Sequence, residues 1–196
     1  MRRRKIKLSY KVIGYPIILA VTVFLGYIVI QPLLAEIHYQ RAKEEYKGMR
    51  WKKAVFEYQK AISIQPGSAH YRLELARIYS MLSHLRQDKE VLEKAVREFR
   101  TALELNPHDG LAYSQLGWTF RQHGMYEEAA GELKMAIELD PTNVSFHWRL
   151  GSVYKANGEL SKAKEEFQKV LDVIPNHRQV QRALAQINDK LKQLEK

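Results

Sequence analysis

Residues 116–141 read LGWTFRQHGMYEEAAGELKMAIELDP, and residues 150–175 read LGSVYKANGELSKAKEEFQKVLDVIP. Each stretch begins with Leu-Gly, carries an aromatic residue four positions after the leucine, and ends at a proline. In a helix, residues at i, i+1 and i+4 share one face, so the leucine, glycine and aromatic residue form a packing surface. Proline ends a helix because it has no backbone N–H and disfavours helical geometry in the preceding residue. Each stretch therefore predicts two helices joined by a turn, at Gly124 and at Gly158.

The same pattern recurs along most of the chain. Its prolines are spaced by 41, 34 and 34 residues: Pro66, Pro107, Pro141 and Pro175. An alanine stands twelve residues before each proline: Ala54, Ala95, Ala129 and Ala163. A single hairpin of this size has too little core to be stable alone, so neighbouring hairpins must stack. The sequence predicts an all-α solenoid over 36–196, with units 35–68, 69–109, 110–143 and 144–177 and a capping helix over 178–194.

The second unit holds seven extra residues between Tyr79 and Ala95. No Gly or Pro occurs from residue 68 to 106, and seven residues make about two helical turns. We therefore expect both helices of this unit to be longer by about one turn, with the bend at Ser83-His84 or Gln87-Asp88. A simple loop bulge is the alternative.

The repeated residues resemble the tetratricopeptide repeat, a 34-residue helix–turn–helix unit with the pattern L-G-x2-Y…A-x3-F…P. The resemblance covers residues 36 to about 196. It implies a protein-binding scaffold whose first helices line a concave groove, mainly through the second, fifth, ninth, twelfth and thirteenth residues of each unit. The expected contacts with a protein or extended peptide are His70, Leu73, Arg77, Ser114, Trp118, Arg121, Trp148, Ser152, Lys155 and Arg182.

Trp118 and Trp148 are the most informative of these positions. Tryptophans of the family often occupy the fourth position of a unit, which here holds Tyr113 and His147. Because aromatic and arginine side chains dominate many interfaces, Trp118 and Trp148 are candidate binding anchors. The alternative is that each closes the seam between two units. The family's carboxylate clamp is not expected, because its asparagine positions are not matched: the corresponding residues are Leu73, Arg77, Gln115, Ser145 and Arg149.

Residues 12–35 contain no charged residue and are rich in Ile, Leu and Val. A helix of about 20 apolar residues spans the hydrocarbon core of a bilayer. We therefore expect a single transmembrane anchor over 12–35. A cleaved signal peptide is the alternative, although Leu33-Leu34-Ala35 is a poor cleavage site. Thr22 and Gly26 form a small-xxx-small pair that favours weak anchor dimerisation.

The charges flanking this segment indicate its orientation. Residues 1–11 hold six Lys or Arg, whereas four follow the segment within 15 residues: Arg41, Lys43, Lys47 and Arg50. By the positive-inside rule, 1–11 form a basic cytoplasmic tail and the solenoid lies on the extracytoplasmic side. A bacterial inner membrane, with the repeats in the periplasm, fits this layout.

The remaining composition argues against several functions. The formal net charge of +10 comes largely from the tail, since 36–196 hold 26 basic and 22 acidic residues. Nucleic acid is therefore not an expected partner. The chain has no cysteine, and its seven histidines show no metal-binding spacing. We expect no enzyme activity, metal or cofactor.

Two functions follow as expectations. The first is a membrane-tethered scaffold or adaptor for protein complex assembly. The alternative is an accessory subunit or tail of an envelope polysaccharide polymerase or ligase, with Trp118 and Trp148 binding a glycan.

Overall fold

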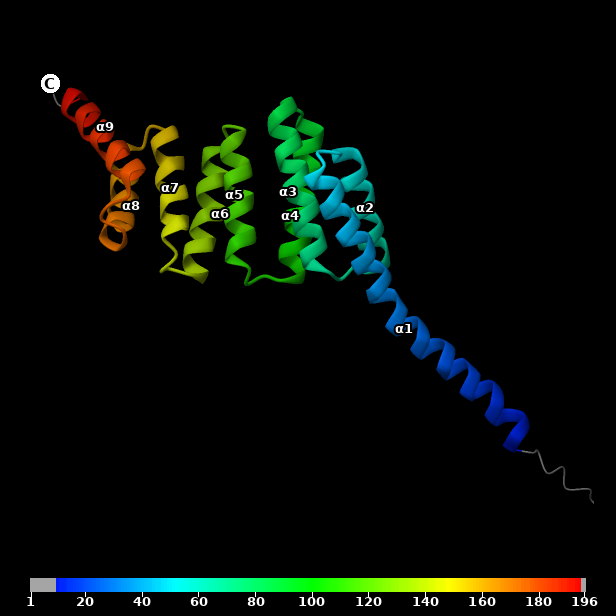
Figure 1. Cartoon of the computed structure of the whole chain (residues 1–196). Coiled ribbons are helices and arrows are strands. Elements are labelled where there is room, and N and C mark those ends of the chain that lie inside the picture. The colour runs from blue at the N-terminus through cyan, green and yellow to red at the C-terminus, as the bar shows by residue number, and fades with distance from the viewer. Residues whose placement is uncertain (1–9, 195–196) are drawn as a thin grey trace, which may run out of the picture. The chain divides into compact units, whose positions relative to one another are not determined.

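The structure is a computed structural model that describes residues 10–194, and all regular structure in this range is helical (Figure 1). The helices of the described residues are α1 (Tyr10–Lys47), α2 (Trp51–Ile64), α3 (Ala69–Arg86), α4 (Lys89–Leu105), α5 (Gly110–Gln122), α6 (Tyr126–Leu139), α7 (Val144–Ala156), α8 (Leu160–Val173) and α9 (Arg178–Leu194). They form two compact units that divide at Gly67. The first unit holds α1 and α2, and the second holds α3 to α9.

In the first unit, the C-terminal part of α1 packs against α2 as a hairpin. Alanines line the contact and are fully buried: Ala35, Ala42, Ala54 and Ala61. Tyr39 and Tyr58 meet edge to face in the same interface, with ring centroids 5.8 Å apart. The small side chains let the two helices approach closely, and the tyrosines fill the space beside them.

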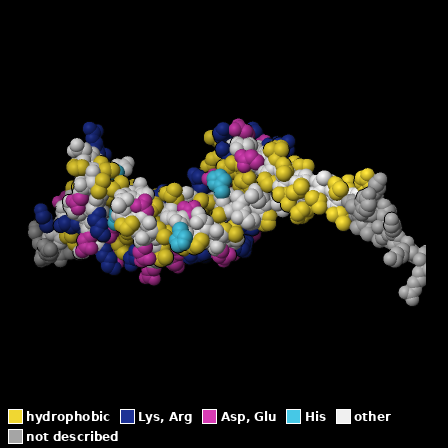
Figure 2. All heavy atoms as spheres, turned by 90° about the horizontal axis from the view of Figure 1, so that it is seen from below, with side chains coloured by type: hydrophobic (Ala, Val, Ile, Leu, Met, Phe, Trp, Pro, Cys, Tyr) yellow, Lys and Arg dark blue, Asp and Glu magenta, His cyan; other side chains and the backbone are white. Residues whose placement is uncertain are grey.

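The N-terminal part of α1 has a different environment. From Ile17 onward, α1 is long and apolar enough to cross a membrane, and none of its apolar window is buried within the structure. Hydrophobic side chains cover much of the visible face of this segment (Figure 2). A signal sequence near the N-terminus also satisfies these criteria of length and apolar composition. The segment is therefore a candidate membrane span. The helix continues without a break from this segment into the hairpin.

In the second unit, α3, α5 and α7 pair with α4, α6 and α8, and α9 packs on α8. The two Leu-Gly positions explain how closely the helices approach. A Cβ atom added to Gly151 would lie 2.8 Å from Cδ1 of Phe167, and one added to Gly117 would lie 2.9 Å from the carbonyl oxygen of Ala129. Both distances are shorter than van der Waals contact, so each position requires a residue without a side chain.

The lengthened second repeat is confirmed. α3 has 18 residues and α4 has 17, whereas α5 to α8 have 13 or 14 each. The bend lies at Gln87-Asp88, one of the two predicted places. Gln87 adopts a left-handed conformation (φ 53°), and the Asp88 carboxylate accepts a hydrogen bond from the backbone N–H of Val91 at 3.2 Å. The extra residues therefore extend the helices instead of forming a loop bulge.

The predicted turns and helix ends are also present. Gly124 and Gly158 have positive φ values of 75° and 83° in the bends of their hairpins. Each repeat proline lies two residues beyond the last residue of a second helix. The side chains of Asp109 and Asn143 cap α5 and α7 by accepting backbone N–H bonds. Local sequence therefore sets where each hairpin begins, turns and ends.

The helix α9 closes the second unit. Its buried face consists of Val180, Leu184 and Ile187, which pack into the common core. Its opposite side is polar and exposed, as in Gln181 and Lys190. A helix with one apolar and one polar face is suited to the end of a helical stack, because its polar face can remain in contact with water. Within the described residues, no further repeat packs on α9.

Candidate protein-binding face

The ten residues predicted to contact a partner all lie on the first helices of the repeats or on α9. They are His70, Leu73 and Arg77 on α3, Ser114, Trp118 and Arg121 on α5, Trp148, Ser152 and Lys155 on α7, and Arg182 on α9. His70, Arg77 and Arg182 are exposed, and Ser114 is buried at 2% exposure. The other six are half-buried. The hydroxyl of Ser114 therefore does not face solvent.

Trp118 and Trp148 stack on each other across the seam between α5 and α7. Their ring centroids are 5.7 Å apart and their planes are inclined by 25°. Such offset stacking contributes about 0.5–1.5 kcal/mol beyond the burial of area. Trp148 also packs against the hydrophobic core, yet both side chains keep part of their surface in solvent. The pair thus bridges two repeats and remains accessible from outside.

Two guanidinium groups lie against the Trp118 ring. The Cζ atoms of Arg121 and Arg149 are 4.6 Å and 5.4 Å from the ring centroid, within the range of cation–π attraction. Arg149 also donates from Nη1 to the carbonyl oxygen of Ser114 at 3.0 Å, which links α7 to α5. We call Trp118, Trp148, Arg121 and Arg149 the Trp–Arg cluster. Arg149 is not one of the ten predicted positions, although it occupies one of the positions that correspond to the family's carboxylate clamp.

Four cations on α5, α7 and α9 have no carboxylate partner in the described part of the chain. Arg121, Arg149, Lys155 and Arg182 take part in no ion pair there. Lys155 donates to the side-chain oxygen of Gln186 at 2.6 Å, a neutral partner. Burial lowers the pKa of the Arg149 guanidinium, because loss of water disfavours the charged form. An anion brought to this face would therefore meet positive charge that the fold itself does not neutralise.

The seam between α3 and α5 is closed by polar contacts. Ser80 and Thr119 are both buried, and their hydroxyl oxygens lie 2.7 Å apart. Ser83 Oγ lies 3.0 Å from His123 Nε2, and the ring of His84 meets that of His123 edge to face. Burial lowers the pKa of His123, and the neighbouring His84 lowers it further. These contacts link α3 to α5 near the C-terminal ends of both helices.

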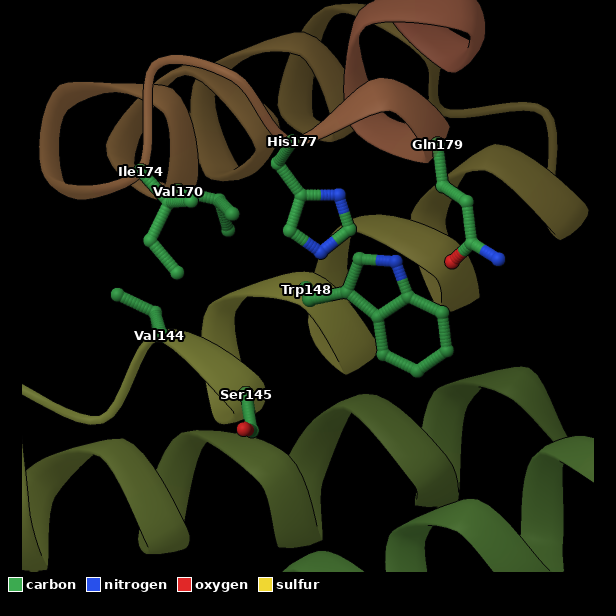
Figure 3. A pocket seen from close by; sticks show the side chains of 7 residues that line it. All are labelled: Val144, Ser145, Trp148, Val170, Ile174, His177 and Gln179. Atoms are coloured by element: carbon green, nitrogen blue, oxygen red, sulfur yellow. The ribbon is translucent and has the colours of Figure 1, made fainter.

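A pocket of about 270 Å³ lies where the first turn of α7 meets the end of α8 and the start of α9 (Figure 3). Its lining is apolar on Val144, Trp148, Val170 and Ile174 and polar on Ser145, His177 and Gln179. The imidazole of His177 points toward the indole of Trp148 (Figure 3). The backbone N–H of Val180 lies 3.0 Å from the carbonyl oxygen of His177 and 3.4 Å from its Nδ1 atom. We call this the Trp148 pocket; it adjoins the Trp–Arg cluster through Trp148.

Among the described residues, no group of three or more His, Cys, Asp or Glu side chains is placed to hold a metal ion. No residue of the chain was predicted to be catalytic. The Trp–Arg cluster and the Trp148 pocket together form the candidate binding site.

Stacked helical hairpins of this kind define an α-solenoid, a class of repeat protein with extended binding surfaces. Two family models, both of the tetratricopeptide repeat, match residues 80–144 and 120–187. Together they cover more than half of the chain, which belongs to the tetratricopeptide repeat family. Proteins of this family mediate protein–protein interaction and scaffolding.

Solved structures share this fold. Residues 41 to the end of MamA from Desulfovibrio magneticus RS-1 are 18% identical, with a TM-score of 0.70, over 81% of this chain and 86% of that one. PilF of Pseudomonas aeruginosa is 22% identical, with a TM-score of 0.68, over 83% and 71%. A tetratricopeptide repeat protein of Thermus thermophilus is 22% identical, with a TM-score of 0.65, over 89% and 97%. At these identities the similarity shows the fold alone. A comparison with curated proteins by sequence gives no significant match.

Proposed function

We propose that this chain is a membrane-tethered scaffold that holds a segment of a partner protein on the face lined by α5, α7 and α9. The observation that carries the proposal is the Trp–Arg cluster, in which two stacked indoles keep exposed surface beside guanidinium groups without carboxylate partners in the described residues. Tryptophan and arginine are enriched among the residues that dominate interface energies. Membership of a family of interaction scaffolds supports the same function.

The proposed tether is the uncharged segment 12–35 of α1. None of the apolar window that begins at or after Ile17 is buried within the described structure, so a bilayer offers those side chains their most favourable surroundings. The basic residues before it, most of which lie outside the described residues, favour a cytoplasmic N-terminus with the repeats in the periplasm of a bacterium. Two anchors would pair through Thr22 and Gly26, and a Cβ added to Gly26 meets no atom within 4 Å. A tether raises the effective concentration of partners at the same membrane.

Photo-crosslinking in native membranes tests the scaffold function. A photo-reactive amino acid at Gln179, exposed beside the Trp148 pocket, should form a discrete adduct with a partner protein. The same amino acid at Lys164, exposed on α8, is the matched control and should form no such adduct. Trp118→Ala should reduce adduct formation at Gln179 about tenfold or more, because loss of an interface anchor commonly costs about 2 kcal/mol or more. Identical adducts from both positions would contradict the proposal.

The unfolding free energy of the Trp118→Ala chain separates binding from packing. If Trp118 is a half-buried binding anchor, its substitution by alanine should lower the unfolding free energy by clearly less than the ~3–5 kcal/mol lost when a fully buried aromatic residue is truncated. A loss of that full size with unchanged adduct formation would assign Trp118 to the seam alone.

A glycan is the second candidate ligand, as in an accessory subunit or tail of an envelope polysaccharide polymerase or ligase. The Trp148 indole lies beside hydrogen-bonding groups of Ser145, His177 and Gln179, which suits a sugar ring as well as a side chain. The ring of Trp118, however, is already contacted by Trp148 and two arginines, which leaves less of it for stacking on a sugar. If the molecule cross-linked at Gln179 is not digested by proteases, the result would favour a glycan over a protein partner.

A further inference from the structure

We propose that the bound segment is acidic and carries one bulky apolar side chain, which enters the Trp148 pocket while its carboxylates lie on Arg121, Arg149 and Arg182. This inference rests on the proposed function and names the chemistry of the partner. It requires a site for one apolar side chain, unneutralised cations beside it, and a rigid arrangement of both.

The Trp148 pocket has the size and lining for a single side chain. Its volume of about 270 Å³ falls below the roughly 300–1,000 Å³ of pockets that enclose whole small molecules. Ile174, on its wall, is 40% exposed although it is a large apolar residue. An apolar side chain in the pocket would remove the exposed surface of Ile174 and part of Trp148 from water. A leucine or an aromatic side chain of the partner fits this description.

The rim of the pocket suits the main chain of a bound segment. The Ser145 hydroxyl and the Gln179 amide are exposed at the rim, and each can donate and accept. The imidazole of His177 also lines the pocket, and its ring nitrogens can donate or accept a hydrogen bond. An extended peptide has unpaired N–H and C=O groups along its length, which these three side chains can satisfy.

The charge of the surrounding face selects an acidic segment. Arg121, Arg149 and Arg182 have no carboxylate partner in the residues that the structure describes. In contrast, Arg77 on α3 is paired with Glu74 at 2.8 Å. A basic segment would face repulsion here, whereas a carboxylate forms charge-assisted hydrogen bonds with a guanidinium.

Two of these cations are already held in place. Arg149 is fixed by its bond to the Ser114 carbonyl oxygen and by the Trp118 ring. Arg121 lies over the same ring, and its Nε is 3.5 Å from the carbonyl oxygen of Ser152. Because these side chains are ordered before a ligand arrives, little conformational entropy remains to be lost on binding. The Trp–Arg cluster is thus a preorganised anion site next to an apolar pocket.

A peptide selection on the full chain in nanodiscs tests the inference. A library of randomised twelve-residue peptides is selected on the chain and depleted on empty nanodiscs. The selected peptides should be enriched in Asp and Glu and should share one Leu, Phe, Tyr or Trp. Binding of a fluorescein-labelled selected peptide should weaken at least tenfold between about 50 mM and 500 mM salt, because exposed charge pairs are screened.

Matched variants locate the peptide on the chain. Ser145→Trp fills the pocket from its exposed rim and should weaken binding at least tenfold, whereas Ser161→Trp, an equal change on exposed α8, should leave it within twofold. Arg182→Glu should weaken binding at least threefold, and Lys164→Glu should not. Gln179→Trp replaces Ser145→Trp if that variant lowers the melting temperature.

The outcomes separate this inference from the proposed function. Selected peptides that lack acidic enrichment but compete for the same face would overturn the inference and leave the scaffold function standing. Acidic peptides that bind equally to Ser145→Trp, Gln179→Trp and Arg182→Glu would also overturn it. A library that yields no binder, together with no adduct at Gln179 in membranes, would contradict both.

Discussion

His147 on α7 and Glu166 on α8 form a hydrogen-bonded pair, with Nδ1 and Oε2 2.7 Å apart. His38 and Glu57 form the same pair in the first unit, at the same positions of their repeat and at the same distance. Both pairs join the first helix of a hairpin to its second helix. The His147–Glu166 pair is the more buried of the two, since each side chain is 11% exposed.

The second repeat uses an arginine for the same purpose. Arg72 and Glu98 occupy the equivalent positions, with Nη1 and Oε2 3.0 Å apart. Three repeats therefore place a basic side chain where the family often has a tryptophan, and each pairs it with a glutamate of the second helix. A pair of this kind favours one register of the two helices, because a shift would break the hydrogen bond between them.

Removal of Glu166 should destabilise the second unit. In Glu166→Ala, the buried His147 keeps only its contact with the carbonyl oxygen of Pro141, so we expect a loss of about 1–3 kcal/mol in unfolding free energy. Urea titration measures the effect. The neighbouring Glu165 is exposed, and Glu165→Ala should change stability by less than about 0.5 kcal/mol. Equal effects of the two substitutions would show that the His147–Glu166 pair does not stabilise the fold.

Substitution by alanine at two glycines, Gly151 and Gly131, should change the stability of the fold in opposite directions. At Gly151, the added Cβ meets the Phe167 ring at 2.8 Å, so Gly151→Ala should destabilise by about 1–3 kcal/mol through overpacking. At Gly131, in the interior of α6, a Cβ meets no atom within 4 Å, so Gly131→Ala should stabilise by up to about 1 kcal/mol through helix propensity. Melting temperatures of both variants check the pair. A Gly151→Ala chain as stable as the wild type would show that the helices can separate without cost.

Acid should destabilise the α3–α5 seam through His123. Burial and then His84 lower its pKa in the folded chain, so the unfolded chain binds the proton more readily. Stability from this residue is therefore present above the unfolded pKa of about 6.5 and is lost as the pH falls below that value. Urea midpoints at about pH 8 and pH 5 measure the loss. His123→Gln, which keeps a hydrogen-bonding group toward Ser83, should show a smaller difference between the two pH values, and an unchanged difference would exclude His123 as its source.

The proposed topology predicts which positions an impermeant maleimide can reach. The chain has no cysteine, so single substitutions report cleanly. Ser161→Cys, exposed on α8, should react in cells whose outer barrier alone is permeabilised. Ser9→Cys should react only after the inner membrane is lysed. The reverse pattern would place the repeats in the cytoplasm. If the mature protein isolated from cells lacks residues 1–35, the segment is a cleaved signal sequence.

The repeat architecture was readable from the chain because it depends on short-range chemistry. Pro107 and Pro141 stop helices for reasons of their own covalent structure, and Gly124 adopts a positive φ at little steric cost. The unbroken run without Gly or Pro around Gln87 indicated longer helices instead of a loop, and the structure has them. The Leu-Gly pattern likewise placed Gly151 on a packing surface, and in the structure this glycine lies against the Phe167 ring.

The candidate site depended on information that no local pattern carries. The resemblance placed Trp118 and Trp148 on one face, but their stacking requires the rotation of α5 against α7 and the choice of rotamer on each. Arg149 joins the Trp118 ring from a position outside the expected set, and Ser114 turns out to be buried. Side-chain direction at a seam is set by the packing of both helices at once, since interiors are filled like crystals and tolerate few arrangements. Periodicity therefore assigns residues to a face of a helix, whereas only the packed tertiary structure decides which of them touch each other and which remain open to a partner.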